Sequence, residues 1–337
     1  MNRAASIWPG ASWVSCALLL SAVSAVSAFT NTGPAFGLTP GSVSNGVEVP
    51  AEEIHASVPA AGETSPDRAE APAARSTARR AEIRVRARAA LVIDIQKGEV
   101  IYQKNATSPF PVASITKLMT AVTYMRMNPD LEKRVSIRRK DVYRANWTKL
   151  RYREQVSATD LLYATLIASD NAAARALARA SGLTMEVFVD RMNETAASLG
   201  LSNSRFTEPT GLDAGNVSTA VDCVALLWTA LQDELLAEIL LAREYRFGTN
   251  RRTHTIRTTN RLVRDTASER QWEGVGSKTG YIRRAGYCLV MRALGDSGDD
   301  IYAVILGGPT SRTRFTDMRR LLDWSMKDTE RPARVDG

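Results

Sequence analysis

The sequence predicts an α/β fold in which strands from both ends of the folded region form one sheet and helices from the middle of the chain flank it. Short segments rich in β-branched residues occur near residue 90 and again near residue 300. The residues between them repeat their apolar positions at helical spacing. A chain of 337 residues is long enough for one or two domains with a sizeable core. We therefore expect a mixed sheet built from distant segments, with a helical insertion.

The individual elements follow from the same patterns. Strands are expected over residues 89–94, 97–103, 287–293 and 301–306. Helices are expected over residues 114–127, 160–180, 184–199, 219–241 and 315–326. The polar residues 169–171 interrupt the second helix, and Thr184 and Thr219 are expected to cap the helices that they open.

The two ends of the chain depart from this pattern. Residues 1–28 are typical of a cleaved export signal, in which Arg3 precedes an apolar stretch that ends in small residues. An uncleaved anchor is disfavoured because interspersed serine and alanine weaken the stretch as a membrane span. Residues 29–85, rich in Ala, Pro and Ser, are expected to form a disordered tether, and residues 329–337 a tail. The folded domain is thereby placed at residues 86–328.

Composition excludes several kinds of site. The chain has only two histidines, so zinc sites built on paired histidines are not expected. No Cys-x-x-Cys pair occurs, and Cys223 and Cys288 lie in apolar runs, so we expect buried free thiols ahead of a disulfide. The net charge of +8 suits a polyanionic partner such as nucleic acid, anionic lipid or cell-wall polymer, but it is more often only a solvated basic surface.

The first motif that could carry out catalysis is Ser114-Ile115-Thr116-Lys117, at the start of a predicted helix. Residues three apart share a helix face, so the hydroxyl and the amine are expected within hydrogen-bond reach. A lysine whose pKa is lowered by burial can take the proton that makes serine a nucleophile. Alone the motif is weak, because about one Ser-x-x-Lys is expected by chance in such a chain.

The second motif is Ser169-Asp170-Asn171, between two helical segments. Ser169 can relay a proton to a leaving group, and the Asn171 amide offers a donor and an acceptor to a peptide backbone. The competing interpretation is a helix break or N-cap, since all three residue types are good capping residues.

The third motif is Lys278-Thr279-Gly280, which follows a glycine-rich segment and precedes a predicted strand. Glycine allows a substrate chain to approach the strand edge, lysine supplies positive charge, and threonine supplies a hydroxyl for an acyl oxygen or a carboxylate. A basic turn is the simpler interpretation of the motif taken alone.

Together, the order and spacing of the three motifs resemble those of the serine acyl-transferases that include penicillin-binding proteins and class A β-lactamases. The similarity extends to the low-molecular-mass D-alanyl-D-alanine peptidases, and most closely to their D-alanyl-D-alanine endopeptidase branch, of the penicillin-binding protein 7 type. The segments that carry this resemblance are residues 111–121, 208–212, 216–220, 259–260, 278–281 and 285–292.

The resemblance implies a β-lactamase/transpeptidase-like α/β fold, with an antiparallel sheet flanked by helices and an all-helical subdomain. It implies that Ser114 forms the acyl-enzyme with Lys117 as general base, and that Ser169, Asn171 and Lys278 complete the centre. Thr279, Gly280 and Tyr281 are expected to bind substrate, with the N–H groups of Ser114 and Tyr281 as the oxyanion hole.

It further implies peptidoglycan stem peptides and cross-links as substrates, β-lactams as covalent inhibitors, and a periplasmic location. No metal, cofactor or nucleic-acid partner is expected. The chain stops shortly after the last predicted helix. The second β-rich domain and the amphipathic anchor of the carboxypeptidases are therefore expected to be missing, which favours the endopeptidase branch.

Three other functions compete with this one. A carboxypeptidase needs a cationic clamp for the terminal carboxylate, for which Arg314 is the candidate, with Arg283 and Arg284 also near. A class A β-lactamase needs a deacylating glutamate. Glu208 lies in the right interval, but its segment resembles the peptidases. A non-catalytic wall-binding or penicillin-sensing module is disfavoured because all catalytic positions are filled.

Overall fold

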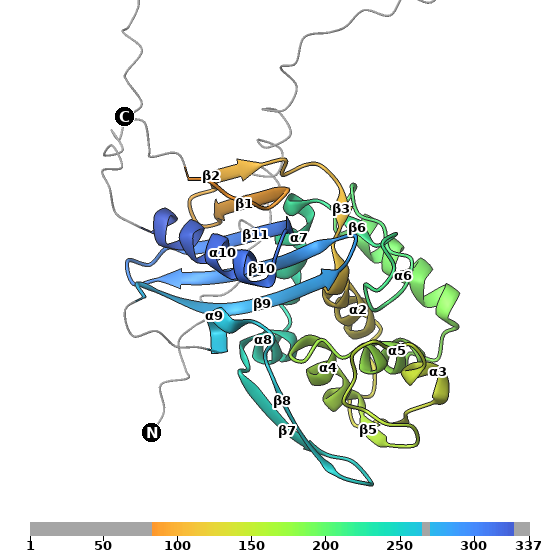
Figure 1. Cartoon of the computed structure of the whole chain (residues 1–337). Coiled ribbons are helices and arrows are strands. Elements are labelled where there is room, and N and C mark those ends of the chain that lie inside the picture. The colour runs from red at the N-terminus through yellow and green to blue at the C-terminus, as the bar shows by residue number, and fades with distance from the viewer. Residues whose placement is uncertain (1–82, 265–269, 327–337) are drawn as a thin grey trace, which may run out of the picture. The chain divides into compact units, whose positions relative to one another are not determined.

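A five-stranded sheet in the order β2-β1-β11-β10-β9 forms the centre of the computed structural model, which describes residues 83–264 and 270–326 (Figure 1). The predicted export signal, almost all of the tether and the tail lie outside the described residues. The strands are β1 (Ala89–Asp94), β2 (Glu99–Lys104), β9 (Trp272–Ile282), β10 (Gly286–Gly295) and β11 (Asp300–Gly308). All four pairings are antiparallel, and Ala89 near the start of the fold lies opposite Leu306 near its end. The expected sheet from distant segments is confirmed, and it is antiparallel throughout, as the resemblance implied, rather than mixed.

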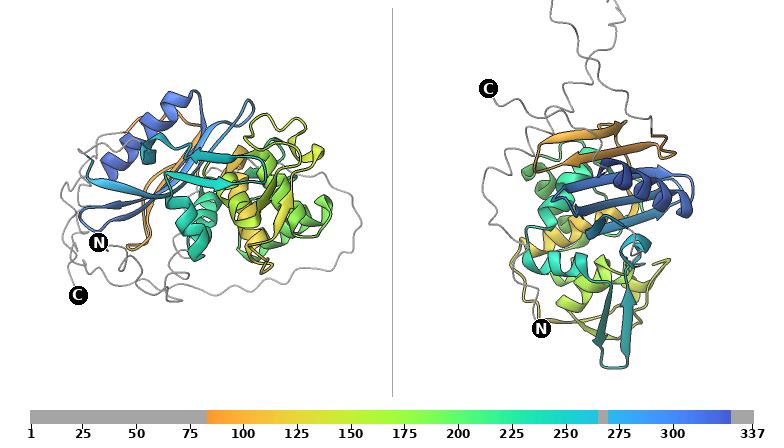
Figure 2. Two further views of the ribbon diagram at one scale, coloured as in Figure 1. Left: turned by 90° about the horizontal axis from the view of Figure 1, so that it is seen from below. Right: turned by 90° about the vertical axis from the view of Figure 1, so that its left-hand side faces the viewer.

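Helices cover both faces of this sheet. Helix α10 (Ser311–Ser325) lies on one face and α7 (Ala220–Ala230) on the other (Figure 2). Every residue of β1 and β11 is therefore buried, whereas β2 at one edge is mostly half-buried or exposed. This explains why β1 and β11 have continuous apolar sequences rather than alternating ones.

The remaining helices form a second group around α2 (Thr116–Met125), in which residues 116–124 are all buried. The short 3₁₀ turn η1 (Ala113–Ile115) leads into α2, so the predicted helix begins as a tighter turn. The other helices of the described residues are α3 (Arg139–Val142), α4 (Ala158–Leu166), α5 (Asn171–Ala180), α6 (Met185–Ser198), α8 (Glu234–Leu241) and α9 (Arg261–Arg264).

Capping residues decide where several helices begin. The predicted break at 169–171 is confirmed, and Thr184 and Thr219 cap α6 and α7 as expected. The helix expected over 219–241 is in fact two, because Asp233 accepts from the N–H of Leu236 and starts α8 anew. Helix α10 starts four residues earlier than expected, since Thr310 caps it.

Short strand pairs complete the fold. Two are minor: β3 (Phe110–Pro111) with β6 (Val217–Ser218), and β4 (Arg134–Ser136) with β5 (Gln155–Ser157). The third is a hairpin of β7 (Glu244–Gly248) and β8 (Thr253–Arg257) that projects beyond the helices (Figure 1). The sequence analysis did not predict this hairpin, although exposed and buried residues alternate along β8 as they do in a half-buried strand.

Two further expectations concern cysteines and membranes. Cys223 and Cys288 are both buried free thiols, as expected, and burial raises the pKa of the Cys288 thiol to about 11. Within the described ranges, none of the helices combines the length and apolar character that crossing a membrane requires.

Candidate active site

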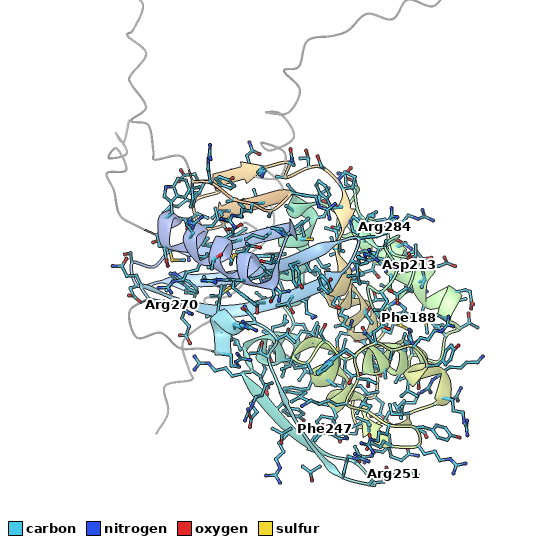
Figure 3. All side chains as sticks on the ribbon, viewed as in Figure 1. Phe188, Asp213, Phe247, Arg251, Arg270 and Arg284 are labelled. Atoms are coloured by element: carbon cyan, nitrogen blue, oxygen red, sulfur yellow. The ribbon has the colours of Figure 1, made fainter. Side chains whose placement is uncertain are left out.

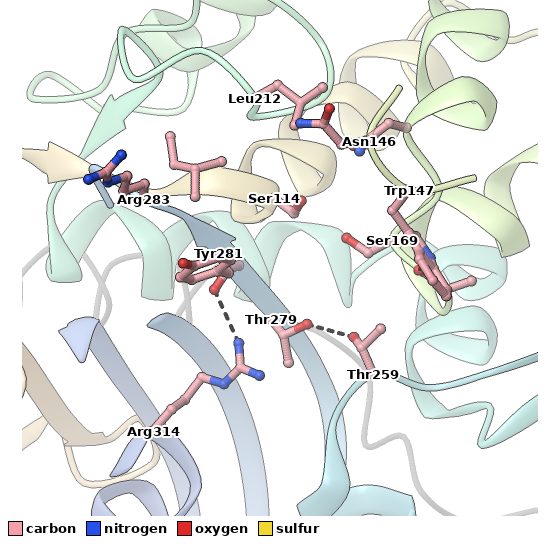
Figure 4. A pocket seen from close by; sticks show the side chains of 14 residues that line it. Ser114, Asn146, Trp147, Ser169, Leu212, Thr259, Thr279, Tyr281, Arg283 and Arg314 are labelled. Atoms are coloured by element: carbon pink, nitrogen blue, oxygen red, sulfur yellow. Dashed lines mark hydrogen bonds between the residues drawn. The ribbon is translucent and has the colours of Figure 1, made fainter. Parts of the chain in front are cut away.

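The three sequence motifs meet at one cavity of about 560 Å³ between the helical group and strand β9 (Figure 4). Ser114 lies in η1, directly before α2, Ser169 and Asn171 lie at the junction of α4 and α5, and Thr279 and Gly280 lie on β9. The third motif was expected to precede a strand, but it lies inside β9, which is the edge strand of the sheet. The cleft therefore runs along an open strand edge.

Lys117 is the most completely enclosed polar group of the site. Its side chain is fully buried, and its Nζ lies 3.0 Å from Ser114 Oγ and 2.6 Å from Asn171 Oδ1. A third hydrogen bond goes to the carbonyl oxygen of Thr210. The three acceptors fix the amine beside the serine hydroxyl, one helical turn apart, as the motif spacing predicted.

Burial has a chemical consequence for this amine. Removal from water lowers the pKa of Lys117 from 10.5 to about 7, although the negative charges of Glu208 and Asp170 partly oppose the change. The nearby Arg175 lowers the pKa further. A substantial fraction of Lys117 is therefore neutral near pH 7 and able to accept a proton.

Backbone strain surrounds the two serines. Ala113, directly before Ser114, has φ 49°, and Ser169 has φ 58°, both in the left-handed region that residues with a Cβ rarely occupy. Gly211 packs so closely on Ala113 that a Cβ at position 211 would lie 2.0 Å from the Ala113 carbonyl oxygen. Ser169 itself thus has an unusual backbone conformation, and Ser114 directly follows a residue that has one, a common feature of functional sites.

The second motif caps a helix and also lines the cleft, through different residues. Asp170 is the N-cap of α5, and its carboxylate also accepts from Thr148 Oγ1 and the Lys149 N–H. Ser169, which precedes the cap, faces the cleft. The capping interpretation therefore holds for Asp170 and does not exclude chemistry at Ser169.

Asn171 was expected to bind a substrate backbone. Its Oδ1 accepts from Lys117, and its Nδ2 donates to the Ala145 carbonyl at 2.6 Å. Each end of the amide retains one further bonding position. In the structure, Asn171 primarily holds the lysine in place.

Lys278 forms a second serine–lysine pair. Its Nζ donates to Ser169 Oγ at 2.8 Å and to the Thr279 carbonyl at 3.1 Å. Burial lowers its pKa well below 10.5, and the positive charges of Lys117 and Arg314 lower it further. The hydroxyl of Thr279 is held 2.6 Å from that of Thr259 (Figure 4).

The expected oxyanion hole requires close approach of two backbone segments. A Cβ at Gly280 would lie 3.1 Å from the Ser114 nitrogen and 2.7 Å from the Val112 carbonyl oxygen. Glycine at position 280 therefore lets β9 lie directly against η1. This contact places residues 280–281 next to the backbone of Ser114, where the expected oxyanion hole would lie.

Arg314, the candidate for binding the substrate carboxylate, lines the cleft below β9 (Figure 4). One guanidinium nitrogen donates to the carbonyls of Gly280 and Cys288, and the ring of Phe315 lies 4.5 Å from the guanidinium carbon. Burial lowers the pKa of Arg314 to about 10, so it remains charged at neutral pH. Arg283 also lines the cavity, but its side chain is exposed.

Two residues of the site were missed by sequence reasoning. Glu208, considered only as a deacylating base, instead accepts hydrogen bonds from the N–H groups of Gly211 and Leu212 and from Asn216 Nδ2. It thereby shapes the loop whose Thr210 carbonyl holds Lys117. An acidic residue before a Pro-Thr-Gly turn is the signal that would have indicated this role.

Trp147 is the other missed residue. It lies beside Ser169 at the rim of the cleft, opposite Tyr281, and 55% of its surface is exposed (Figure 4). Its indole N–H donates to the Ala168 carbonyl at 3.1 Å. The only sequence signal was a tryptophan in an otherwise polar segment.

A serine that directly follows a strained residue and lies beside a buried lysine, a second serine–lysine pair and an open strand edge define the class of active-site-serine acyl-transferases. The family model of the D-alanyl-D-alanine carboxypeptidases matches residues 74–310. The chain is 35% identical to the D-alanyl-D-alanine endopeptidase of Escherichia coli over 240 residues, which are 70% of this chain and 76% of the relative. The Pseudomonas aeruginosa endopeptidase is also 35% identical, with the same coverage.

Solved structures of DD-peptidases superpose on most of this chain. The Streptomyces K15 DD-transpeptidase superposes with a TM-score of 0.65 and 25% identity, over 72% of this chain and 98% of that one. A D-alanyl-D-alanine carboxypeptidase of Mycobacterium tuberculosis superposes with a TM-score of 0.67 and 25% identity, over 74% of this chain and 94% of that one. The chain therefore belongs to the D-alanyl-D-alanine carboxypeptidase family and is a serine-type DD-peptidase, which confirms the resemblance found in its sequence and the fold that it implied.

Proposed function

We propose that the protein hydrolyses D-Ala peptide bonds of periplasmic peptidoglycan through an acyl-enzyme on Ser114, and that its preferred bond is the cross-link from D-Ala to a diamino acid. The observation that carries the proposal is the position of the Lys117 amine, fully buried and 3.0 Å from Ser114 Oγ. Because its pKa is lowered to about 7, this amine can take the proton of Ser114 at neutral pH.

The remaining groups support a two-step reaction. As Lys117 accepts the proton, Ser114 Oγ attacks the D-Ala carbonyl, and the N–H groups of Ser114 and Tyr281 stabilise the oxyanion. Ser169, which accepts a hydrogen bond from Lys278, relays the proton from Lys117 to the leaving nitrogen, so that Lys117 is neutral again when the amine departs. Water then attacks the ester while Lys117 takes its proton and passes it to Ser114 Oγ, which releases the shortened peptide and restores Ser114.

The open edge of β9 supports binding of an extended peptide. A peptide added as a further strand would use backbone hydrogen bonds along residues 278–281, while the Thr279 hydroxyl and Arg314 meet a carboxylate of the substrate. The same surface would accept a β-lactam, whose ring carboxylate and strained amide match these positions. We therefore expect penicillins to acylate Ser114 and deacylate slowly.

Preference for the cross-link rests on the relatives named endopeptidases, to which the chain is 35% identical. It is tested by digestion of purified cross-linked peptidoglycan followed by chromatography of the muropeptides. The wild-type protein should convert dimers into monomers, and Ser114→Ala should not. Release of free D-Ala from pentapeptides with dimers left intact would instead make the protein a carboxypeptidase.

Acylation is tested separately by intact-mass measurement after incubation with penicillin. The wild-type protein should gain one penicillin mass and Ser114→Ala none. An adduct that persists in Ser114→Ala would remove Ser114 from the proposed mechanism.

A further inference from the structure

Trp147 is an exposed apolar side chain inside the catalytic cleft. Of the large hydrophobic side chains that are exposed in the described part of the chain, only Trp147 and Tyr281 line this cleft. They lie on opposite sides of it, and Trp147 is beside Ser169 (Figure 4). Binding sites use aromatic side chains in this way, as apolar walls around a few polar groups. The indole is therefore a candidate contact for substrate.

Hydrogen bonds on both sides of Ser169 hold the tryptophan in place. Its indole N–H donates to the Ala168 carbonyl at 3.1 Å, and its own carbonyl accepts from the Asn171 N–H, also at 3.1 Å. The ring is thus fixed to the second motif before substrate arrives, which reduces the entropy lost on binding. Because the indole has a single donor and that donor is occupied, its exposed part offers a ligand carbon surface and no further hydrogen bond.

The ring lies on the side of the cleft where the leaving group departs. In the proposed mechanism Ser169 relays a proton to the leaving nitrogen, so that nitrogen lies within hydrogen-bond distance of Ser169. The acylated part of the substrate is expected to extend along β9 toward Tyr281, away from Trp147 (Figure 4). Whatever is attached to the leaving nitrogen therefore lies near the indole.

Space for a large leaving group continues beyond the indole. A second cavity, of about 490 Å³, shares Trp147, Ala168 and Thr259 with the cleft as lining residues. The leaving residue of a pentapeptide is D-Ala, whose side chain is one methyl group. In a cross-link the leaving residue is a diamino acid, whose aliphatic chain leads to the rest of its peptide. That chain would pass the indole on its way to the second cavity.

We propose that Trp147 determines specificity for the cross-link, by packing its indole against the aliphatic chain of the diamino acid on the leaving side. This assignment rests on the proposed function. A methylene group that is fully removed from water contributes a factor of about four to binding. The methyl group of D-Ala offers less carbon surface, so the indole favours the cross-link over the pentapeptide. Because the contact involves no charge, ionic strength should not weaken it.

A series of peptides measures the contact directly. In these substrates the leaving D-Ala is replaced by D-aminobutyrate, D-norvaline or D-norleucine, so that each step adds one methylene group and no charge. For the wild-type protein, kcat/KM should rise about two- to fourfold per methylene group. Trp147→Ala should remove the rise, and Trp147→Phe should keep most of it. If kcat/KM of the wild-type protein does not rise along the series, the assignment is wrong whatever the stability of the variants.

The natural substrates provide a second measurement. For a purified muropeptide dimer, kcat/KM should fall about tenfold in Trp147→Ala and by no more than about threefold in Trp147→Phe. The value for monomeric pentapeptide should change little in both variants, so the ratio of dimer to pentapeptide falls mainly in Trp147→Ala. Phenylalanine keeps an aromatic ring but cannot donate to Ala168. An equal loss in both variants would therefore overturn the substrate contact in favour of a purely structural role of the hydrogen bond.

Two control variants exclude general effects. Tyr143→Ala removes an aromatic side chain that is 65% exposed and lines neither cavity. Arg251→Gln removes an arginine at the tip of the β7–β8 hairpin, also outside both cavities (Figure 3). Neither control should alter the ratio, and melting temperatures identify any variant that is unstable. A ratio that declines with ionic strength in the wild-type protein would show selection by charge and would count against the indole.

The outcomes separate this assignment from the proposed function. If the wild-type protein cleaves dimers and Trp147→Ala retains its ratio, the assignment of Trp147 is wrong and the endopeptidase function stands. If the wild-type protein is acylated by penicillin but leaves dimers intact, both are wrong. A lower ratio in Trp147→Ala, with the ratio largely kept in Trp147→Phe and in both controls, supports both.

Discussion

The inner and outer parts of the cleft hold their cations in opposite environments. At the centre, Lys117 and Lys278 are 0% and 1% exposed and are held by serine hydroxyls and carbonyl groups. Their pKa values are lowered, because a charged amine loses the solvation of water there. Beyond the rim, Lys149 and Arg264 line an adjoining cavity and are exposed to solvent. The lysines at the centre are thus removed from water, whereas Lys149 is in contact with it.

This difference predicts the size of the effects of substitution. A buried amine that moves a proton affects the chemical step itself, whereas an exposed cation affects only which molecule is bound. Asp170 connects the two parts, since it lies between Ser169 and Asn171 and accepts from the Lys149 N–H. Four predictions separate the contributions, beginning with the largest.

Lys117→Met should lower the rate of acylation by penicillin by at least about 10³-fold, because it removes the base and keeps the side-chain volume. The measurement is intact-mass analysis over time, with circular dichroism to confirm the fold. Lys140→Met, on the exposed face of α3, should acylate normally. Normal acylation of a folded Lys117→Met variant would exclude the amine as the base.

The pH dependence of acylation should follow Lys117. Only the neutral amine accepts a proton, so the rate should rise about tenfold per pH unit below pH 7 and level off above it. Since Lys117 and Lys278 interact, the apparent pKa belongs to the pair. Stopped-flow acylation with a chromogenic β-lactam between pH 5 and 9 gives the profile. A flat profile over this range would contradict the proposed base.

Asp170→Ala should lower the free energy of unfolding by about 2–4 kcal/mol, since it removes an N-cap and two further hydrogen bonds of a buried carboxyl. Urea denaturation measures the loss. Asp233→Ala is the matched control, because Asp233 caps α8 by accepting a hydrogen bond from the Leu236 N–H. Its free energy of unfolding should fall by about 1 kcal/mol. Equal losses in the two variants would show that the bonds to Thr148 and Lys149 add no stability.

Glu208→Gln should have the smallest effect, a displacement of the pH profile. The carboxylate raises the pKa of Lys117, so its removal should lower that pKa and move the midpoint of acylation to lower pH. Asp213→Asn, in the same loop, provides a comparison at a residue that does not contribute to the Lys117 pKa. A midpoint displaced to higher pH would show that Glu208 acts mainly through the loop and not through its charge.

Much of the fold was predictable because its signals are local. The continuous apolar sequences of β1 and β11 indicate buried strands. The threonines before α6 and α7 indicate helix N-caps. The hairpin β7–β8 was missed because its strands are short and half-exposed. The division of residues 219–241 was missed because the apolar pattern continues through Asp233.

The sequence by itself determined which residue types were available for catalysis and in what order, since Ser114 and Lys117 are brought together by helical spacing alone. Only the tertiary structure decided how those residues behave. The pairing of Ser169 with Lys278, the hydrogen bond from Lys117 to the Thr210 carbonyl and the cavity beyond Trp147 all join segments far apart in the chain. The pKa of a lysine depends on the water and charge around it, and packing decides both.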